Sequence, residues 1–313
     1  MKKKKIIILM LLSLMILTGC TKQLKSDNKV VTYEETGQVL TSNILCKPEN
    51  ESLLEEYEKY DDDLKVSLDD LPTCKSFTPN KIKYVSLWET IFVKPIAYLI
   101  LKLGYLVKDM GLSVILIGLI LRLILMPFQF KTLKQSENMK KIQPEMERIE
   151  RKYRNKNDNE SLMMKSQETM ALYKKYNISP LSSCLTAFIQ LPILIGFIEA
   201  VQRVPAIFEG TTFFGINLGM TPAIGISKGY WIYIVILLLI IFTTYLSFKN
   251  SMSSSNQNPE MAKQMRTMFI FMIVMISFTS LSLSSAIALY WIATNGFAVI
   301  QNIIIKKVME RRK

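Results

Sequence analysis

Residues 112–130 read LSVILIGLILRLILMPFQF, and this stretch decides the fold class. A helix that spans a bilayer needs about 20 mostly apolar residues. The stretch has that length and carries one charge, Arg122. At ~1.5 Å per residue, Arg122 lies about 13 Å from Lys131 at the polar end, which is too far for easy snorkelling. The stretch predicts a transmembrane helix with a cation near its middle.

The free energy of insertion still favours a spanning helix. An arginine at a helix centre costs about 2.5–3.5 kcal/mol. The fourteen apolar neighbours contribute about −0.3 to −0.6 kcal/mol each, which offsets that cost. A buried arginine usually pairs with a carboxylate, but in the other predicted spans we find only Glu199, at the far end of one. We therefore expect a hydrated cationic site at Arg122 rather than a structural ion pair.

Composition supports a membrane protein without catalytic chemistry. The chain has 313 residues, is 50% hydrophobic, carries a net charge of +13 and contains no histidine. It therefore lacks the commonest general base and the usual zinc ligand sets. The spans also lack a carboxylate pair, which argues against a lipid-modifying enzyme. We predict no enzymatic activity, no cofactor and no metal.

The N-terminus has the pattern of a secretory signal. Lys2–Lys5 form a basic region, Ile6–Leu17 an apolar region, and Leu17-Thr18-Gly19-Cys20 a small-residue processing site. This ending resembles a bacterial lipobox, whose cysteine becomes the lipidated first residue. We predict that residues 1–19 are a signal peptide and that Cys20 carries the lipid; an uncleaved signal anchor is the alternative.

Residues 20–84 form an acidic segment, predicted to lie outside the membrane and to be held there by the lipid anchor. Between residues 21 and 84 there are thirteen Asp and Glu against nine Lys. Apolar content is too low for a substantial core, so we expect a tether or loosely folded segment. Cys46 and Cys74 lie in this exported stretch and form either a disulfide or two free thiols. Cys184 lies in a later span and is expected to be a packing residue.

Aromatic and basic residues alternate through residues 85–108, which predicts an amphipathic helix in the membrane interface. The predicted core, 109–313, then has spans at 112–130, 180–201, 230–248, 267–282 and 285–305. The last two are a short hairpin, because the serine cluster from Ser280 to Ser285 is the only plausible turn in that apolar stretch.

Loop charge sets the predicted orientation. Residues 131–175 contain twelve Lys and Arg against seven Asp and Glu, and the tail 306–313 is basic. Both are placed in the cytoplasm by the positive-inside rule, with the lipidated N-terminus outside a bacterial cell membrane. Apolar spacing in 131–176 predicts a hairpin of two helices. Its charges are either a solvated face or a contact for ribosome, nascent chain or anionic lipid; sequence-specific nucleic-acid binding is not expected.

Polar side chains in the spans gather in the predicted cytoplasmic halves, whereas the outer halves are almost wholly apolar. This asymmetry predicts a cavity that is wet from the cytoplasm and sealed outside. The polar residues beside Arg122 are Ser183, Thr186, Gln190, Thr243, Thr244, Ser247, Asn295 and Gln301. The fourth span instead carries a methionine stripe, either a packing face or an adaptable contact for client helices. The stripe includes Met265, Met268, Met272 and Met275.

Several motifs from about residue 85 to the tail resemble those of the YidC/Oxa/Alb membrane protein insertases, in their Gram-positive lipoprotein form. The motifs are Phe92-Val93-Lys94-Pro95, Leu121-Arg122-Leu123-Ile124-Leu125-Met126-Pro127, Met139-x-x-Ile142-Gln143-Pro144-Glu145, Tyr176-Asn177-Ile178-Ser179-Pro180-Leu181, Gln190-Leu191-Pro192-Ile193-Leu194 and Leu289-Tyr290-Trp291. The acidic segment falls outside the resemblance.

The resemblance implies an all-α membrane protein whose five transmembrane helices surround a hydrophilic groove open to cytoplasm and lipid. Arg122 matches the arginine that meets the polar part of a client, Gln301 a groove glutamine, and Trp291 the tryptophan of the last span. Ser247 stands where a groove glutamine often occurs, which puts one polar contact in doubt. The implied partners are nascent membrane proteins and membrane lipids, with or without the Sec translocase.

A secondary transporter or channel for a small anion is the alternative function. Transporter folds usually show internal repeats and helices broken at the midplane. We find no repeat in this sequence, and only Pro127 and Pro192 interrupt the spans. The insertase is therefore the stronger prediction.

Overall fold

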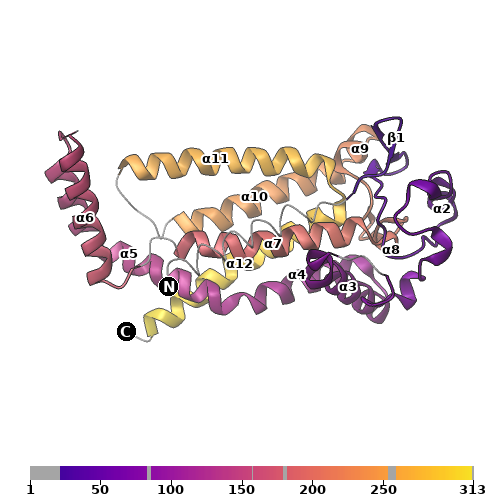
Figure 1. The fold of residues 1–313 in the computed structure, drawn as a ribbon, viewed down its shortest axis with the longest axis horizontal. Coiled ribbons are helices and arrows are strands. Elements are labelled where there is room, and N and C mark those ends of the chain that lie inside the picture. The colour runs from indigo at the N-terminus through magenta and orange to yellow at the C-terminus, as the bar shows by residue number, and fades with distance from the viewer. Residues whose placement is uncertain (1–21, 83–85, 157, 179–181, 253–258, 312–313) are drawn as a thin grey trace. The chain divides into compact units, whose positions relative to one another are not determined.

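The computed structural model describes residues 22–82, 86–156, 158–178, 182–252 and 259–311 (Figure 1). The predicted signal peptide and Cys20 lie outside these residues. The longer helices are α2 (Glu51–Glu58), α3 (Lys94–Val107), α4 (Met110–Ile124), α5 (Met126–Tyr153), α6 (Asn159–Lys175), α7 (Ser182–Gln202), α10 (Ile232–Met252), α11 (Pro259–Ser282) and α12 (Ser285–Arg311). Short helices α8 (Pro205–Phe208) and α9 (Pro222–Ser227) lie between α7 and α10.

Strands occur in the described residues only as three antiparallel two-residue pairs. They are β1 (Lys25–Ser26) with β2 (Lys29–Val30), β3 (Thr32–Tyr33) with β4 (Gln38–Val39), and β5 (Thr212–Phe213) with β6 (Ile216–Asn217). The chain divides into two compact units. The described residues of Met1–Leu121, Gln190–Ile241 and Ile276–Thr294 form the first unit, and those of Arg122–Ile189, Phe242–Met275 and Asn295–Lys313 form the second.

Three helical stretches among the described residues are long and apolar enough to cross a membrane: Glu89–Val107, Ile232–Lys249 and Ser285–Met309. The bent pair α4 and α5 would make a fourth. Gln190–Gln202 and Phe269–Ser282 are shorter apolar helices. The chain is therefore a mostly helical, multi-pass membrane protein. Length and composition alone would let Glu89–Val107 cross the bilayer, so its predicted place in the interface stays a prediction.

The prediction of one continuous helix over 112–130 is wrong. Helix α4 ends at Ile124, and α5 begins at Met126 with Pro127 in its first turn. A proline ring clashes with the carbonyl four residues earlier and supplies no N–H, but it is well suited to the first turn of a helix. Arg122 therefore lies in the last turn of α4 instead of near the middle of a long helix.

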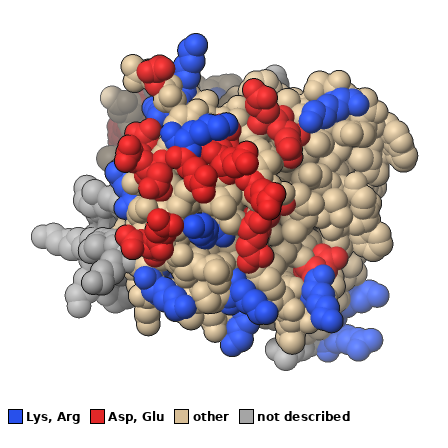
Figure 2. Space-filling view, turned by 90° about the vertical axis from the view of Figure 1, so that its right-hand side faces the viewer, with Lys and Arg blue, Asp and Glu red and all other residues tan. Residues whose placement is uncertain are grey.

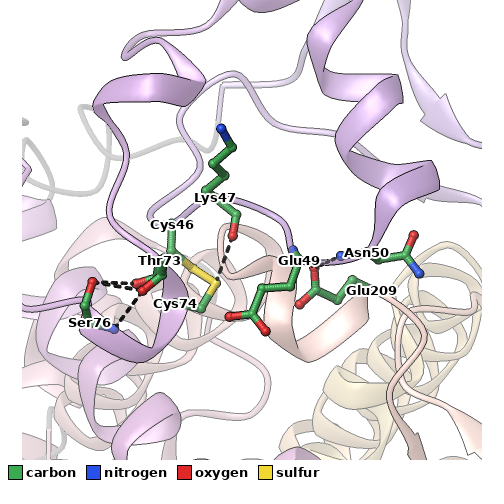
Figure 3. Close-up of a disulfide and its surroundings, with 8 residues drawn as sticks. All are labelled: Cys46, Lys47, Glu49, Asn50, Thr73, Cys74, Ser76 and Glu209. Atoms are coloured by element: carbon green, nitrogen blue, oxygen red, sulfur yellow. Dashed lines mark hydrogen bonds between the residues drawn. A yellow bond between two sulfur atoms is a disulfide. The ribbon is translucent and has the colours of Figure 1, made fainter.

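The expectation that the acidic segment is loosely folded is also wrong. Residues 22–82 have buried apolar side chains, including Leu24, Leu40, Ile44, Leu45, Leu53 and Tyr57. Cys46 and Cys74 form a disulfide with an S–S distance of 2.04 Å (Figure 3). The acidic side chains remain outside this core, and Figure 2 shows them gathered over one end of the first unit. Exposed carboxylates of the segment include Glu51, Glu55, Glu58, Asp62 and Asp63.

The acidic segment is stabilised by residues much later in the chain. The Glu209 carboxylate accepts hydrogen bonds from the backbone N–H groups of Glu49 (2.7 Å) and Asn50 (3.2 Å), as Figure 3 shows. Thr221 N–H donates to the carbonyl of Thr36 at 2.8 Å. These bonds join the segment to the connection between α7 and α10, so its fold depends on non-local contacts that sequence periodicity does not report.

A buried arginine adds to the contacts between the acidic segment and the residues that follow α7, which together form its docking surface. Arg203, with a fully buried side chain, donates from Nε to the carbonyl of Asn43 (2.6 Å) and from Nη1 to the Glu89 carboxylate (2.7 Å). The Glu199 carboxylate lies 4.0 Å from Nη1 and accepts a 3.1 Å bond from the Trp88 indole. Glu199, the carboxylate noted at the far end of a predicted span, thus has an arginine partner four residues later, just after α7 ends.

Candidate functional site

Arg122 lies where α4 ends, with its side chain half-buried. The last carbonyls of a helix carry a partial negative charge, because they lack partners within the helix. A cation in the last turn is therefore stabilised more than one at a helix centre. This placement lowers the cost of keeping a charge in an apolar helix, and it comes from the break at Leu125.

Thr244 and Asn295 form a polar contact within the second unit. The Asn295 side-chain amide donates to the Thr244 hydroxyl at 3.0 Å, and Thr244 is almost fully buried. This bond joins α10 to α12, the two helices on which the sequence placed part of its polar lining. Thr243 and Ser247, also of α10, are half-buried. The second unit therefore has hydrogen-bonding side chains in its interior.

Gln301, like Thr244, is almost fully buried, with 1% of its surface exposed. Within the described residues, neither its amide nitrogen nor its amide oxygen has a hydrogen-bond partner. An unsatisfied buried polar group costs roughly 1–3 kcal/mol. The neighbouring Asn302 is also buried. An amide held at this cost points to water or to another molecule as its partner.

The remaining predicted polar residues do not all belong to the second unit. Gln190 and Trp291 belong to the first unit and are half-buried there; Trp291 packs against that unit's apolar core. The side chains of Ser183 and Thr186 lie outside the described residues.

The methionine stripe on α11 is described only in part. The side chains of Met265 and Met268 lie outside the described residues, Met272 is half-buried, and Met275 is exposed. The most exposed side of α11 carries residues that the stripe did not include. They are Ile270, Phe271, Val274 and Phe278, which share one helical face with Met275. Residues at this spacing lie on one face of a helix, so the sequence could have indicated this apolar face.

Helices α5 and α6 pack as a hairpin around Ile142, Leu172 and Ile178. Two carboxylates add polar contacts at its surface. A hydrogen bond from Tyr176 and one from Lys175 hold the pKa of Glu145 below its usual value. Hydrogen bonds from Lys152 and Tyr153 do the same for the pKa of Glu168. The hairpin has its own small core and its own pH-sensitive contacts.

Comparison with known proteins identifies the family. Residues 102–312 match the model of the family described as 60Kd inner membrane protein. The membrane protein insertase YidC of Oceanobacillus iheyensis is 36% identical over 240 residues, which cover 75% of this chain and 89% of the relative. The chain belongs to the YidC/Oxa/Alb family of membrane protein insertases.

Other members of the YidC/Oxa/Alb family match nearly as well. The membrane protein insertase MisCA of Bacillus subtilis is 34% identical over 221 residues, covering 70% of this chain and 79% of MisCA. YidC 1 of Streptococcus pyogenes is 32% identical over 209 residues, covering 66% of this chain and 71% of the relative. These matches support a non-enzymatic insertase and not the small-anion transporter. The family model begins after the acidic segment, at residue 102.

Proposed function

We propose that this insertase receives the polar part of an entering client in a hydrophilic groove that five transmembrane helices surround and that opens to the cytoplasm and to lipid. The clients are nascent membrane proteins. Arg122 attracts an acidic extracytoplasmic tail and lowers its desolvation cost, while the client's apolar helix leaves along the lipid side. No covalent step is required.

The observation that carries this proposal is Arg122 in the last turn of α4, beside the break at Leu125. The carbonyls of that turn stabilise the cation in the resting state. A client carboxylate would form a charge-assisted hydrogen bond with the guanidinium, and such bonds are about twice as strong as neutral ones. The contact would be transient, because the client has a favourable destination in the lipid.

The buried polar side chains support a hydrated interior around this site. Gln301 has an amide without a partner among the described residues, and Asn295 and Thr244 bond each other in the same unit. Water could satisfy the Gln301 amide in the resting state and be replaced by client backbone groups. We assign Gln190, Ser183, Thr186, Thr243, Ser247 and Trp291 to the same groove on the sequence pattern and the family resemblance.

We further propose the topology that charge and the N-terminal motif predict. The lipidated Cys20 and the acidic segment lie outside the cell membrane, and the α5–α6 hairpin and basic tail lie in the cytoplasm. The hairpin and tail are then available to the ribosome, and the Sec translocase is a second candidate partner. The exposed face of α11 around Met275 is available to client helices or lipid.

Insertion of a single-span client with a short acidic tail tests the proposal. Arg122→Ala should abolish most insertion of this client into vesicles, but should affect much less a matched client whose tail is neutral. Arg266→Ala, which removes a charge from the exposed Arg266 of α11, is the control and should retain activity. Full activity of Arg122→Ala on the acidic client would refute the electrostatic role. Full activity of Arg122→Lys would show that charge suffices without the guanidinium geometry.

A further inference from the structure

The β5–β6 hairpin has a backbone conformation that does not suit its tip residue. Phe214 and Gly215 form the turn, with φ of +49° and +77°. Turns of this kind favour Gly, which has no Cβ to clash at positive φ, and Asn or Asp, whose short polar side chains can hydrogen-bond to the nearby backbone. Phe214 also leaves 89% of its surface exposed. A strained and exposed phenylalanine is poor for stability, which points to a role outside the folded unit.

The rest of the hairpin is firmly held. Phe213 packs on Gly111 at the start of α4, where an added Cβ would lie 2.5 Å from the Phe213 Cβ. Ile216 is buried in an apolar cluster with Tyr233 and Ile236. The N–H of Asn217 donates to the Tyr233 hydroxyl at 3.2 Å. Phe214 therefore protrudes from a rigid support that joins the beginnings of α4 and α10.

The neighbours of the hairpin place it at the level of the membrane surface. Tyr233 lies in the first turn of α10, and Ile232–Lys249 is one of the stretches able to span the bilayer. Tyr230 and Trp231, directly before that stretch, are 52% and 70% exposed. Exposed Tyr and Trp at the end of a span are typical of the boundary between headgroups and acyl chains. Phe214 is three residues from Asn217, at most about 10 Å along the chain, so its ring can reach the same boundary.

We propose that the β5–β6 hairpin is a lipid anchor, which inserts the Phe214 ring into the headgroup and acyl boundary of the leaflet at the N-terminal end of α10. The ring is apolar and has no polar group to satisfy, so lipid is a better occupant than water. Through Phe213 and Asn217 the anchor fixes the depth at which α4 and α10 enter the bilayer. The proposal depends on the chain's spanning a membrane and does not depend on the role of Arg122.

Depth-dependent quenching tests the anchor in the full chain. Phe214→Cys, in a Cys184→Ala background, is labelled with the fluorophore NBD and reconstituted in phosphatidylethanolamine and phosphatidylglycerol vesicles. The control is Lys29→Cys in the exposed β1–β2 pair, and the background chain without an added cysteine measures labelling elsewhere. Lipid with a nitroxide near the headgroup should quench position 214 several-fold more strongly than position 29. Equal quenching at both positions would overturn the proposal. So would a label at 214 that is shielded from water but not quenched, because its neighbour would then be protein.

A second measurement separates anchoring from simple turn formation. Asn suits positive φ, so Phe214→Asn relieves the strain and, without an anchor, should slow hydrogen exchange of residues 212–217. With an anchor, the same variant in vesicles should exchange several-fold faster than the parent, and Phe214→Trp should exchange like the parent. Exchange of Phe214→Asn in vesicles that is equal to or slower than the parent's would overturn the proposal.

Discussion

Replacement of Arg203 by methionine should strongly destabilise the first unit, where the acidic segment contacts the residues that follow α7. The guanidinium is fully buried between Glu89 and Glu199, whose side chains are only 12% and 5% exposed. Methionine would leave two buried carboxylates without their cation and would remove the 2.6 Å hydrogen bond to the Asn43 carbonyl. Breaking one side of a buried ion pair costs about 3–5 kcal/mol.

The expected loss appears as a lower melting temperature of the purified protein in detergent. For a unit of this size, 1 kcal/mol corresponds to roughly 2–4 °C, so the midpoint should fall by about 6–20 °C. The control variant combines Arg203→Met with Glu89→Gln and Glu199→Gln. It removes the stranded charges and should recover more than half of the loss, because neutral replacement of a buried ionic cluster is often nearly neutral. A midpoint unchanged in Arg203→Met, or no recovery in the triple variant, would refute the reasoning.

Three further predictions concern other parts of the chain. Replacing Cys46 and Cys74, 28 residues apart, by serine should lower the stability of the acidic segment. The loss of loop-closure entropy predicts about 3.5 kcal/mol. A reductant added to the parent should produce the same shift in melting temperature. The lowered pKa values of Glu145 and Glu168 mean that these carboxylates stabilise the α5–α6 hairpin above pH 4.5, their usual pKa, and that this stabilisation is lost as the pH falls below it. Amide hydrogen exchange in α6 should accelerate at that lower pH. Exchange that does not depend on pH, after correction for its intrinsic rate, would contradict this. Gln301→Leu should raise the melting temperature, because it removes a buried amide without a partner among the described residues. The same substitution should reduce client insertion. Unchanged insertion would exclude Gln301 from the groove.

Some features could be predicted from sequence because they have local causes. The turn between α11 and α12 falls within the predicted serine cluster, and the α5 and α6 helices follow the apolar spacing around Ile142 and Leu172. The family could be predicted because its motifs are contiguous. In the candidate site, the hydrogen bond between Asn295 and Thr244 joins two residues that the polar pattern had singled out.

Other features depended on competing or non-local effects. Hydrophobicity favoured one helix over 112–130, but Pro127 ends α4 and so moves Arg122 to a helix terminus. The acidic segment has few apolar residues and no clear period, and it is held by hydrogen bonds from Arg203 and to Glu209, far along the chain. Such contacts leave no periodic signal in a single sequence.

The docking of the acidic segment has a consequence for biosynthesis. Asn43 and its partner Arg203 are separated by 160 residues, and at about 5–20 residues per second the ribosome needs roughly 8–32 s to make that interval. The segment therefore emerges well before the surface that completes it exists. The Cys46–Cys74 pair, 28 residues apart, can close during this delay and limit the conformations of the waiting chain. Oxidation before docking is thus the expected order of assembly, and a chain unable to form the bond would be open to proteolysis during that interval.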